Sequence, residues 1–457
     1  MEAIVTPAEM RAIDAAAPEP VEVLIARAGA AVARAALDLL GGSYGRRVVV
    51  IAGKGNNGHD GREAARRLEQ RGVRCRVFDA ADPPPDLPPA DLVIDAAYGT
   101  GFAGTYRAPR PAHRGVPVLA VDIPSGVDGL TGTVAGEPLA ADVTVTFAAL
   151  KPGLLVGAGP ALAGEVRVAD IGLDVASARA HLVDDAALRA WLPVRPPDTH
   201  KWRAALRLIA GSPGMGGAAR LAAGAALRSG AGYVALSSPG AVDRPTAPIE
   251  SVVLPLPAQG WAAEVLDGLD RFAALAVGPG LGRSPTTAVE VARLVAGASR
   301  PTVVDGDALT VLGPNAGEIV GHRGDGAGPV VLTPHDGEYA ALAGGPPGED
   351  RFGAVRALAE RSAATVLLKG STTLIAGPDG HVLAVTAGDA RLATAGTGDV
   401  LTGIVGALLA AGLDGPVAAA AAAHLHGRAG ALALPYGLVA SDLADLLPLV
   451  LSEIQEP

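Results

Sequence analysis

Short apolar runs alternate with helix signals along most of the chain. Residues 46–52 and 142–147 are rich in valine and bounded by polar or glycine positions, as expected of buried strands. Thr6-Pro7-Ala8-Glu9 has the sequence of a capping box, and residues 21–40 have the character of a helix ended by Gly41-Gly42. The alternation predicts an α/β fold with mostly parallel strands.

The alternation occurs as two series separated by a weaker stretch. The pattern fades from about residue 175 to 200, where Pro193, Pro196 and Pro197 occur, and a second series of strands and helices begins at residue 207. Proline-rich stretches of this kind favour a domain boundary. We therefore expect domains at 1–195 and 196–457, which agrees with a length of 457 residues.

Composition excludes several classes of protein. Hydrophobic residues make up 49% and charged residues 18% of the chain, as in a globular protein, and the net charge of −10 argues against general binding to nucleic acid or to anionic membranes. The single cysteine, Cys75, rules out an intrachain disulfide. The longest apolar stretch, 400–413, is too short to span a bilayer, and no signal peptide is visible. These features predict a cytoplasmic protein.

The loop at residues 53–61 is the first candidate site, and we expect a helix to follow it at 62–70. Gly53, Gly55 and Gly58 match the spacing of a dinucleotide-binding fingerprint, with Asp79 near the position of a ribose-binding acid. Glycines at a strand–helix turn also serve simply to let the chain turn. Neither interpretation explains the polar residues of the loop, Asn56, Asn57 and Asp60, which have the character of ligands.

Two further strands end in a carboxylate followed by a glycine-rich loop, at Asp95 and Asp122. The carboxyl ends of parallel strands share one sheet edge, so we expect Asn57, Asp95 and Ser125 to converge and to hold a hard cation. The alternative is that each is a turn former. Lys151 either pairs with a substrate phosphate or with Asp122, or is a solvated loop lysine.

In the second series, Gly396–Gly398 leads into an apolar helix expected at 404–413. The amides of such a turn can bind a phosphate, and Asp399 can take a proton from a substrate hydroxyl, although an aspartate there can also be a simple helix cap. Strand ends nearby carry Lys369, the hydroxyls of 372–373, and His335. His335 alone would more often be a core histidine. Because the chain lacks GxxxxGK[ST], it is not a Walker A protein.

Taken in order, these motifs resemble those of the bifunctional NAD(P)H-hydrate repair enzymes. The resemblance covers nearly the whole chain and is carried by GKGNNGHDG (53–61), DAAYGTGFAG (95–104), VDIPSGVDGLTG (121–132), TFAALKPG (146–153), IAGSPGMGGAARLAAGAALRSGAG (209–232), GPGLG (278–282), DGDAL (305–309), LTPHDGE (332–338), LLKGSTT (367–373) and LATAGTGDVLTGIVGALLA (392–410). It implies a Rossmann-like three-layer α/β/α epimerase domain followed by a ribokinase-like α/β dehydratase domain.

The resemblance implies that the first domain interconverts the R and S epimers of NADHX and NADPHX at the hydrated C6 of the nicotinamide ring. Asp122 is expected to be the acid–base group, with Lys151 as its helper. K⁺ is expected at Asn57, Asp95 and Ser125. The implied substrate contacts are Asn56, Asn57, Gly58, His59, Asp60, Gly99, Thr100, Gly101, Phe102, Ala103, Gly104, Thr105 and Asp122.

The second domain, by the same resemblance, phosphorylates the C6 hydroxyl of the S epimer, and loss of phosphate regenerates NADH or NADPH. Asp399 is expected to be the base and Mg²⁺ the metal. The implied contacts with the hydrate are Ala218, Gly280, Gly282, His335 and Asp399, and those with the nucleotide are Lys369, Gly370, Ser371, Thr372, Thr373 and Gly398. The sequence does not select between ADP and ATP, and ADP is the expectation. The expected partners are these small molecules, with no nucleic acid and no membrane, in a homo-oligomer.

Two departures from the family pattern stand out. His59 replaces a glycine, which would narrow the pocket or alter the backbone angle and so affect the epimerase rate. Trp202-Arg203-Ala204 replaces a run containing glycine and an acidic residue, which we expect to change a loop rather than the chemistry. The rival hypothesis is a ribokinase-like small-molecule kinase with a non-catalytic binding module at its N-terminus.

Overall fold

The computed structural model describes residues 1–241 and 247–456. The chain forms two compact units, the first comprising Glu2–Ala180 and the second comprising His181–Pro457 together with Met1. In the part of the chain that is described, no helix has both the length and the apolar character needed to cross a membrane.

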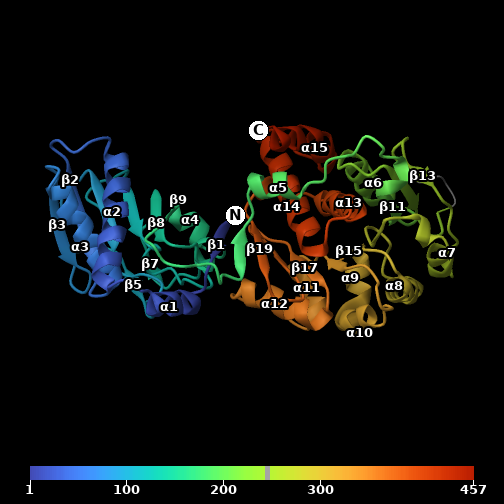
Figure 1. Ribbon diagram of the computed structural model, residues 1–457, viewed down its shortest axis with the longest axis horizontal. Helices are drawn as coiled ribbons and strands as arrows, with labels where there is room; N and C mark the ends of the chain where they lie inside the picture. Colours follow the sequence, from blue (N-terminus) through green and yellow to red (C-terminus); the bar gives the residue numbers. More distant parts are fainter. Residues whose placement is uncertain (242–246, 457) are drawn as a thin grey trace. The chain divides into compact units, whose positions relative to one another are not determined.

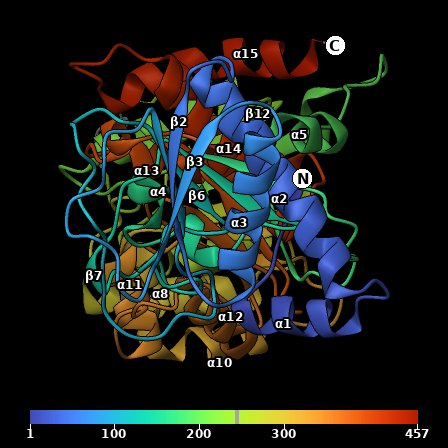
Figure 2. The same ribbon diagram turned by 90° about the vertical axis from the view of Figure 1, so that its left-hand side faces the viewer.

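The first unit is built on a parallel sheet with strand order β3-β2-β4-β6-β8-β9. Helices α2 and α3 lie side by side against one face of this sheet (Figure 2). Its elements are β1 (Glu2–Ile4), α1 (Pro7–Ala16), α2 (Val21–Leu40), β2 (Arg47–Ala52), α3 (Asn56–Glu69), β3 (Arg74–Asp79), β4 (Leu92–Ala96), β5 (Tyr106–Arg107), β6 (Val118–Val121), β7 (Gly136–Glu137), β8 (Val143–Phe147), α4 (Gly159–Ala163) and β9 (Glu165–Ala169).

Strand β2 shows why the sheet needs a layer on each face. Val48 and Val50 point to one core, which also contains residues of α2 and α3, whereas Val49 and Ile51 point to a second core with Tyr106. All four valine and isoleucine side chains are at most 2% exposed. A strand buried on both faces has a continuous apolar run rather than an alternating one, as this sequence does.

The helix after β2 begins earlier than the sequence predicted. We expected a loop at 53–61 and a helix from 62, but α3 starts at Asn56, with Gly55 at the N-cap. The polar residues Asn56, Asn57 and Asp60 therefore lie on the first turns of a helix. The prediction was wrong because asparagine and glycine are weak helix formers and mask the start of the helix. By contrast, α1 begins as expected, with the capping box of Thr6 present, and α2 begins and ends as expected.

The second unit has a mixed sheet in which β10-β19-β18-β17-β16-β15-β14-β11-β12-β13 are neighbours, parallel from β13 to β17 and antiparallel from β17 to β19. Its elements are β10 (Ala180–Leu182), α5 (Asp185–Trp191), β11 (Ala205–Ile209), α6 (Gly216–Arg228), β12 (Tyr233–Ser237), β13 (Val252–Val253), α7 (Trp261–Asp267), β14 (Ala274–Val277), α8 (Pro285–Gly297), β15 (Thr302–Val304), α9 (Asp307–Leu312), α10 (Ala316–Gly321), β16 (Val330–Leu332), α11 (Asp336–Ala343), α12 (Arg351–Ser362), β17 (Thr365–Leu368), β18 (Thr373–Ala376), β19 (Val382–Val385), α13 (Thr397–Ala410), α14 (Gly415–Leu432) and α15 (Ala440–Gln455).

In Figure 1, helices α6, α13, α14 and α15 lie on one face of this sheet, and α8 to α12 lie on the other. The first group packs through small residues: Ala222 and Ala225 on α6, and Ala418 to Ala422 on α14, are fully buried. An added Cβ at Gly403 of α13 would lie 2.1 Å from the Ala222 carbonyl oxygen. The abundant alanine and glycine therefore allow the backbones of α6 and α13 to approach closely.

Residues 175–200 are more ordered than the fading sequence pattern suggested. They contain strand β10 and helix α5. Leu188 of α5 and Leu192, which follows the helix, pack in the core of the second unit, so the compact units divide between Ala180 and His181 rather than after residue 195. The boundary was misplaced because the prolines follow α5, whose short apolar pattern is too brief to detect.

Candidate active sites

A cavity of about 800 Å³ opens in the first unit at the carboxyl ends of its strands. Its wall combines the N-terminal turn of α3 with the loops after β4 and β6, as the sequence predicted. The lining includes aromatic rings at Tyr98, Phe102 and Phe147, and Tyr98 and Phe102 have ring centroids 4.2 Å apart. Rings beside polar groups suit a flat, polar ligand.

The cavity contains a buried ion pair between Lys151 and Asp122. Nζ of Lys151 lies 2.7 Å from Oδ1 of Asp122, with the lysine side chain 1% exposed. The same amine donates to Thr146 Oγ1 at 2.8 Å and to the Phe147 carbonyl at 3.0 Å. Of the alternatives for Lys151, pairing with Asp122 is therefore observed, and the solvated lysine is wrong.

Two more carboxylates, Asp60 and Asp14, line the same cavity. Asp60 is 6% exposed, and burial, followed by the charges of Asp122 and Asp14, raises the pKa of its carboxyl to about 8. Burial also raises the pKa of Asp14. Asp60 therefore holds its proton near neutral pH, in the same cavity as the ion pair of Asp122 with Lys151.

The residues expected to hold a cation include buried oxygens that suit one. Asp95 is 1% exposed and accepts from the backbone N–H of Ser125 at 2.9 Å and from its hydroxyl at 2.7 Å. The amide oxygen and nitrogen of Asn57 are buried without a hydrogen-bond partner in the described part of the chain. A buried amide oxygen without a partner and a buried carboxylate are oxygen ligands of the kind that suits a hard monovalent cation such as K⁺.

Not all the residues predicted to contact substrate lie on the cavity wall. The wall includes Asn56, Asn57, Asp60, Gly99, Thr100, Gly101, Phe102, Ala103 and Asp122, but not Gly58, His59, Gly104 or Thr105. His59 is exposed on α3, so the expectation that it narrows the pocket was wrong. Gly58 packs closely against the backbone instead: an added Cβ at this position would lie 1.9 Å from the Gly53 carbonyl oxygen.

In the second unit, Asp399 lies on the first turn of α13, which begins at Thr397 and not at 404 as expected. The N-cap is Gly396, with φ at +92°, a conformation that favours glycine. In the described residues, the Asp399 carboxylate has no hydrogen-bond partner, so the alternative of a simple helix cap is wrong. Burial, with the nearby charge of Asp305, raises the pKa of Asp399 to about 6 despite the opposing effect of Lys369.

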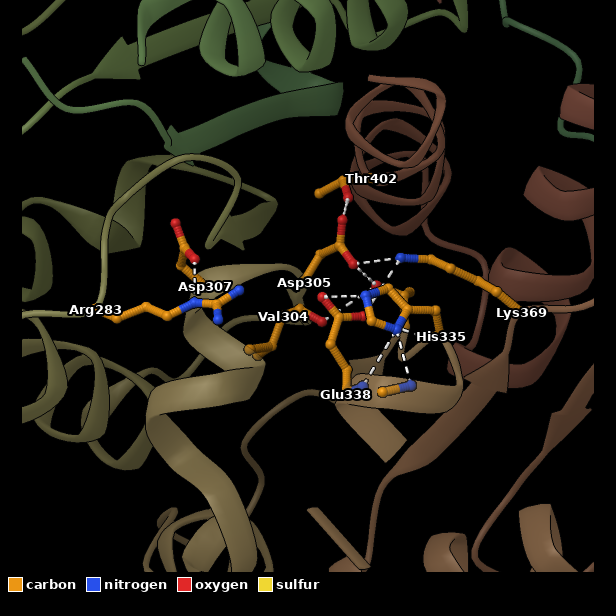
Figure 3. A network of polar contacts seen from close by, with 10 residues as sticks. Arg283, Val304, Asp305, Asp307, His335, Glu338, Lys369 and Thr402 are labelled. Carbon is orange, nitrogen blue, oxygen red and sulfur yellow. Dashed lines mark hydrogen bonds and ion pairs between the residues drawn. The ribbon is translucent and has the colours of Figure 1, made fainter. Parts of the chain in front are cut away.

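Lys369 occupies a network of carboxylates next to α13 (Figure 3). Its Nζ lies 2.6 Å from Oδ1 of Asp305 and 4.0 Å from Oε2 of Glu338. An added Cβ at Gly398 would be 3.6 Å from the same Nζ, which places the amine beside the first turn of α13. The lysine predicted to bind phosphate is thus already held by an acid.

His335 caps a helix and is not a core residue. Its side chain is 61% exposed, and Nδ1 accepts from the backbone N–H groups of Gly337 and Glu338 at 3.0 and 3.2 Å. Figure 3 shows its ring beside Glu338 and Lys369. The core-histidine alternative was therefore wrong, and Nε2 of His335 lies 3.6 Å from Oε1 of Glu338.

The other predicted hydrate contacts lie close to one another. An added Cβ at Gly280, whose φ is +65°, would be 3.0 Å from Cβ of Ala218. Gly282 donates its N–H to Oδ2 of Asp307 at 2.9 Å. This close packing of backbone on α6 explains why small residues occupy both Ala218 and Gly280.

The predicted nucleotide segment, Lys369 to Thr373, connects β17 to β18. A cation that sequence reasoning missed, Arg351 on α12, packs against it. Its Nη2 donates to the Lys369 carbonyl at 3.0 Å and to Asp336 Oδ1 at 2.9 Å, and an added Cβ at Gly370 would be 3.0 Å from that nitrogen. Arg351 lies outside all the motifs that carry the family resemblance, so no local signal marks it.

Comparison with known proteins assigns a family to each unit. The family described as NAD(P)H-hydrate dehydratase matches residues 206–450, and the one described as YjeF-related protein N-terminus matches residues 21–88 and 78–153. Proteins named bifunctional NAD(P)H-hydrate repair enzyme Nnr are 38% identical in Salinibacter ruber, over 95% of this chain and 92% of the relative, and 38% identical in Moorella thermoacetica, over 99% and 97%.

The chain belongs to the family of bifunctional NAD(P)H-hydrate repair enzymes. The family resemblance seen in the sequence motifs is thus confirmed. The Bacillus subtilis ADP/ATP-dependent NAD(P)H-hydrate dehydratase, co-crystallised with ATP and Mg²⁺, is 30% identical with a TM-score of 0.52, covering 59% of this chain and 97% of that one. A ribokinase-like protein of Enterococcus faecalis, 24% identical over 61% of this chain and 97% of that one, has a TM-score of 0.53, which confirms the predicted ribokinase-like fold.

For a member of the NAD(P)H-hydrate repair enzymes, the departure at Trp202 is structurally mild. The Trp202 ring packs at a tilt against Tyr233, with ring centroids 4.5 Å apart, and its edge faces Phe272 at 6.1 Å. It precedes β11, at the amino end of the strand. Asp305, His335 and Lys369 follow the carboxyl ends of their strands, so Trp202 lies at the opposite end of the sheet from them.

Proposed function

We propose that this protein repairs hydrated NADH and NADPH, with epimerisation in the first unit and nucleotide-dependent dehydration in the second. The observation that carries the proposal is Asp399: a largely buried carboxylate without a hydrogen-bond partner in the described chain, on the first turn of α13. A base at a helix N-terminus can take a proton from an alcohol while the helix amides hold the phosphoryl group that the alcohol attacks.

In the dehydratase reaction, the C6 hydroxyl of the S epimer attacks the terminal phosphoryl group of ADP or ATP, AMP or ADP leaves, and the hydroxyl proton passes to Asp399. The C6–O bond then breaks with loss of phosphate, and loss of the C5 proton forms the C5=C6 bond of the reduced nicotinamide. Lys369 to Thr373, supported by Arg351, and Gly398 bind the nucleotide, while Ala218, Gly280, Gly282 and His335 contact the hydrate. Mg²⁺ neutralises charge on the phosphates when bound. We propose ADP as the preferred donor.

In the epimerase reaction, C6 carries a hydroxyl and is bonded to the ring nitrogen, so the C6–O bond breaks readily once the oxygen is protonated. Water added to the opposite face gives the other epimer. The protonated carboxyl of Asp60 gives its proton to the leaving oxygen. Asp122, whose carboxylate is fixed by the 2.7 Å ion pair with Lys151, is the acid–base group that takes the proton of the added water. The wall residues of the cavity, Asn56, Asn57, Asp60, Gly99 and Thr100 to Ala103, contact the substrate. K⁺ bound by Asn57, Asp95 and Ser125 would supply positive charge to this wall.

The experiment is to incubate the full chain with a mixture of R- and S-NADHX, Mg²⁺, K⁺ and either ADP or ATP, and to follow the absorbance of reduced nicotinamide. Consumption of both epimers supports the proposal. Recovery of the S fraction alone would mean that the first unit is only a binding module, and no recovery would favour a kinase for another alcohol. Replacing K⁺ by Li⁺ should slow consumption of the R epimer only.

Two coarser expectations accompany this function. We propose that the protein acts in the cytoplasm, where the coenzymes turn over, and that it forms a homo-oligomer. Its partners are the hydrated coenzymes and the nucleotide, with neither nucleic acid nor membrane. Light scattering of the purified chain measures the oligomer directly.

A further inference from the structure

Asp305, at the carboxyl end of β15, is a buried acid to which the proposed reaction gives no role. It is 2% exposed. Its Oδ1 accepts from Lys369 Nζ at 2.6 Å and from Thr333 Oγ1 at 2.7 Å, and its Oδ2 accepts from Thr402 Oγ1 at 2.6 Å. Figure 3 shows the carboxylate pointing between Lys369 and Thr402.

The three donors come from three segments that carry the proposed site. Lys369 begins the nucleotide segment, Thr333 follows β16 two residues before His335, and Thr402 is on α13. Thr402 is three residues after Asp399, and residues at that spacing lie on neighbouring positions of one helical face. A single carboxylate therefore fixes the segments that carry the nucleotide-binding lysine, the histidine and the base.

The charge of Asp305 also decides where Lys369 points. Asp399 and Lys369 interact electrostatically, yet the lysine pairs with Asp305 at 2.6 Å. Without Asp305, the amine would have Glu338, at 4.0 Å, and Asp399 as its remaining acidic neighbours. An ion pair with Asp399 would tie up the carboxylate that has to take the proton.

We propose that Asp305 is a positioning residue that holds Lys369 away from Asp399 and anchors the first turns of α13, leaving the Asp399 carboxylate free to accept the hydroxyl proton. The proposal rests on the proposed role of Asp399 as base. Asp305 does not touch the reacting atoms in this scheme; it acts through Lys369 and Thr402.

The proposal has a consequence for the protonation of Asp399. The charged groups that act on that carboxyl are Asp305, Lys369, Asp307 and Glu338, and after burial the charge of Asp305 is the largest cause of its raised pKa. Asp305→Asn removes this negative charge and releases Lys369 to approach. Both changes favour the ionised form of Asp399, so its pKa falls.

The test is to titrate the Asp399 carboxyl by ¹³C NMR in the full chain, with its signal assigned from the Asp399→Asn variant. In Asp305→Asn the midpoint should fall from about 6 towards that of an ordinary aspartate, and the acid limb of kcat against pH should fall with it. Asp325→Asn, on an exposed loop, makes the same change in net charge and should leave the midpoint in place. An unmoved midpoint in folded Asp305→Asn overturns the proposal.

Thr402 gives a second test if Asp305→Asn does not fold. Thr402→Val keeps the shape of the side chain and removes the hydroxyl that donates a hydrogen bond to Asp305. Because α13 is then misplaced, kcat should fall roughly tenfold or more. The KM for the nucleotide should be nearly unchanged. Thr402→Ser should restore most of kcat, and equal rates for the Val variant and the unsubstituted protein overturn the anchoring role. The NMR midpoint of Asp399 can be measured without turnover. If the protein does not dehydrate NADHX at all, the proposed function is contradicted, and the NMR titration still tests the role of Asp305.

Discussion

Nζ of Lys151 lies 2.7 Å from Oδ1 of Asp122, with only 1% of the lysine side chain exposed. Asp122 itself has φ at +67°, a left-handed backbone that most side chains avoid. Fixed geometry, burial and a strained backbone at one residue are typical of a functional site and are unusual in a structural ion pair.

Lys151→Met should abolish epimerisation and destabilise the first unit, because it leaves the Asp122 carboxylate without its partner. Loss of one member of a buried pair costs about 3 kcal/mol or more of unfolding free energy. Chemical denaturation and the rate of R-NADHX consumption measure the two effects. The double variant Lys151→Met with Asp122→Asn should regain much of the stability but none of the activity. Full stability in the single variant would contradict a buried pair.

Asp60→Asn should change the pH dependence of stability in a specific direction. The folded-state pKa of Asp60 is raised to about 8 from 3.8, so its ionisation is disfavoured in the folded protein, and its contribution to stability is lost as pH rises from about 4 through 8. The asparagine variant lacks this loss. It should therefore gain in melting temperature relative to the unsubstituted protein between pH 6 and 9, and a parallel offset at every pH would contradict the assignment.

Asp399→Asn should abolish NADH recovery and yet stabilise the second unit above pH 6. The carboxyl has a pKa raised from 3.8 to about 6, so its ionised form costs about 3 kcal/mol of folding free energy at neutral pH. The cost develops as pH rises through 3.8 to 6 and is absent at lower pH. Thermal unfolding at pH 8 and pH 4 measures it, with nucleotide binding by calorimetry as the control for an intact site.

Gly58→Ala should impair the epimerase and His59→Ala should not, although the two residues are neighbours. An added Cβ at Gly58 would lie 1.9 Å from the Gly53 carbonyl oxygen, so alanine forces the start of α3 away from β2, and the epimerase rate should fall at least roughly tenfold. His59 is exposed and should tolerate alanine with a rate within about twofold, since its side chain is absent from the cavity wall. Equal effects would place His59 in the site after all. Epimerase rates for the two purified variants decide between these outcomes.

The sequence predicted the strands and the convergence of loops, because valine-rich runs ending in carboxylates are strong local signals. It missed the true starts of α3 and α13. In both helices the first residues, Asn56 and Thr397, follow a glycine N-cap and include weak helix formers, so the apolar pattern begins only turns later. In both places the reactive polar groups lie on a helix turn where a loop was expected.

Pairing of Lys151 with Asp122 was one of the predicted alternatives, but the pairings of the second unit could not be predicted. Asp305 was visible as an acid after a strand, but its bonds to Lys369 and Thr402 join residues 64 and 97 positions away. Arg351 was invisible for the same reason. A single sequence carries spacing along the chain, whereas these contacts depend on how parallel strands are ordered across the sheet.

The left-handed backbone at Asp122 has a consequence for how this protein would evolve in the laboratory. Glycine adopts that conformation without strain and asparagine with little. A library randomised at position 122 and screened only for heat resistance should therefore be enriched in glycine and asparagine, whereas a screen that demands turnover should return aspartate. Aspartate, which the proposed reaction needs at position 122, is less favourable in this backbone conformation than glycine.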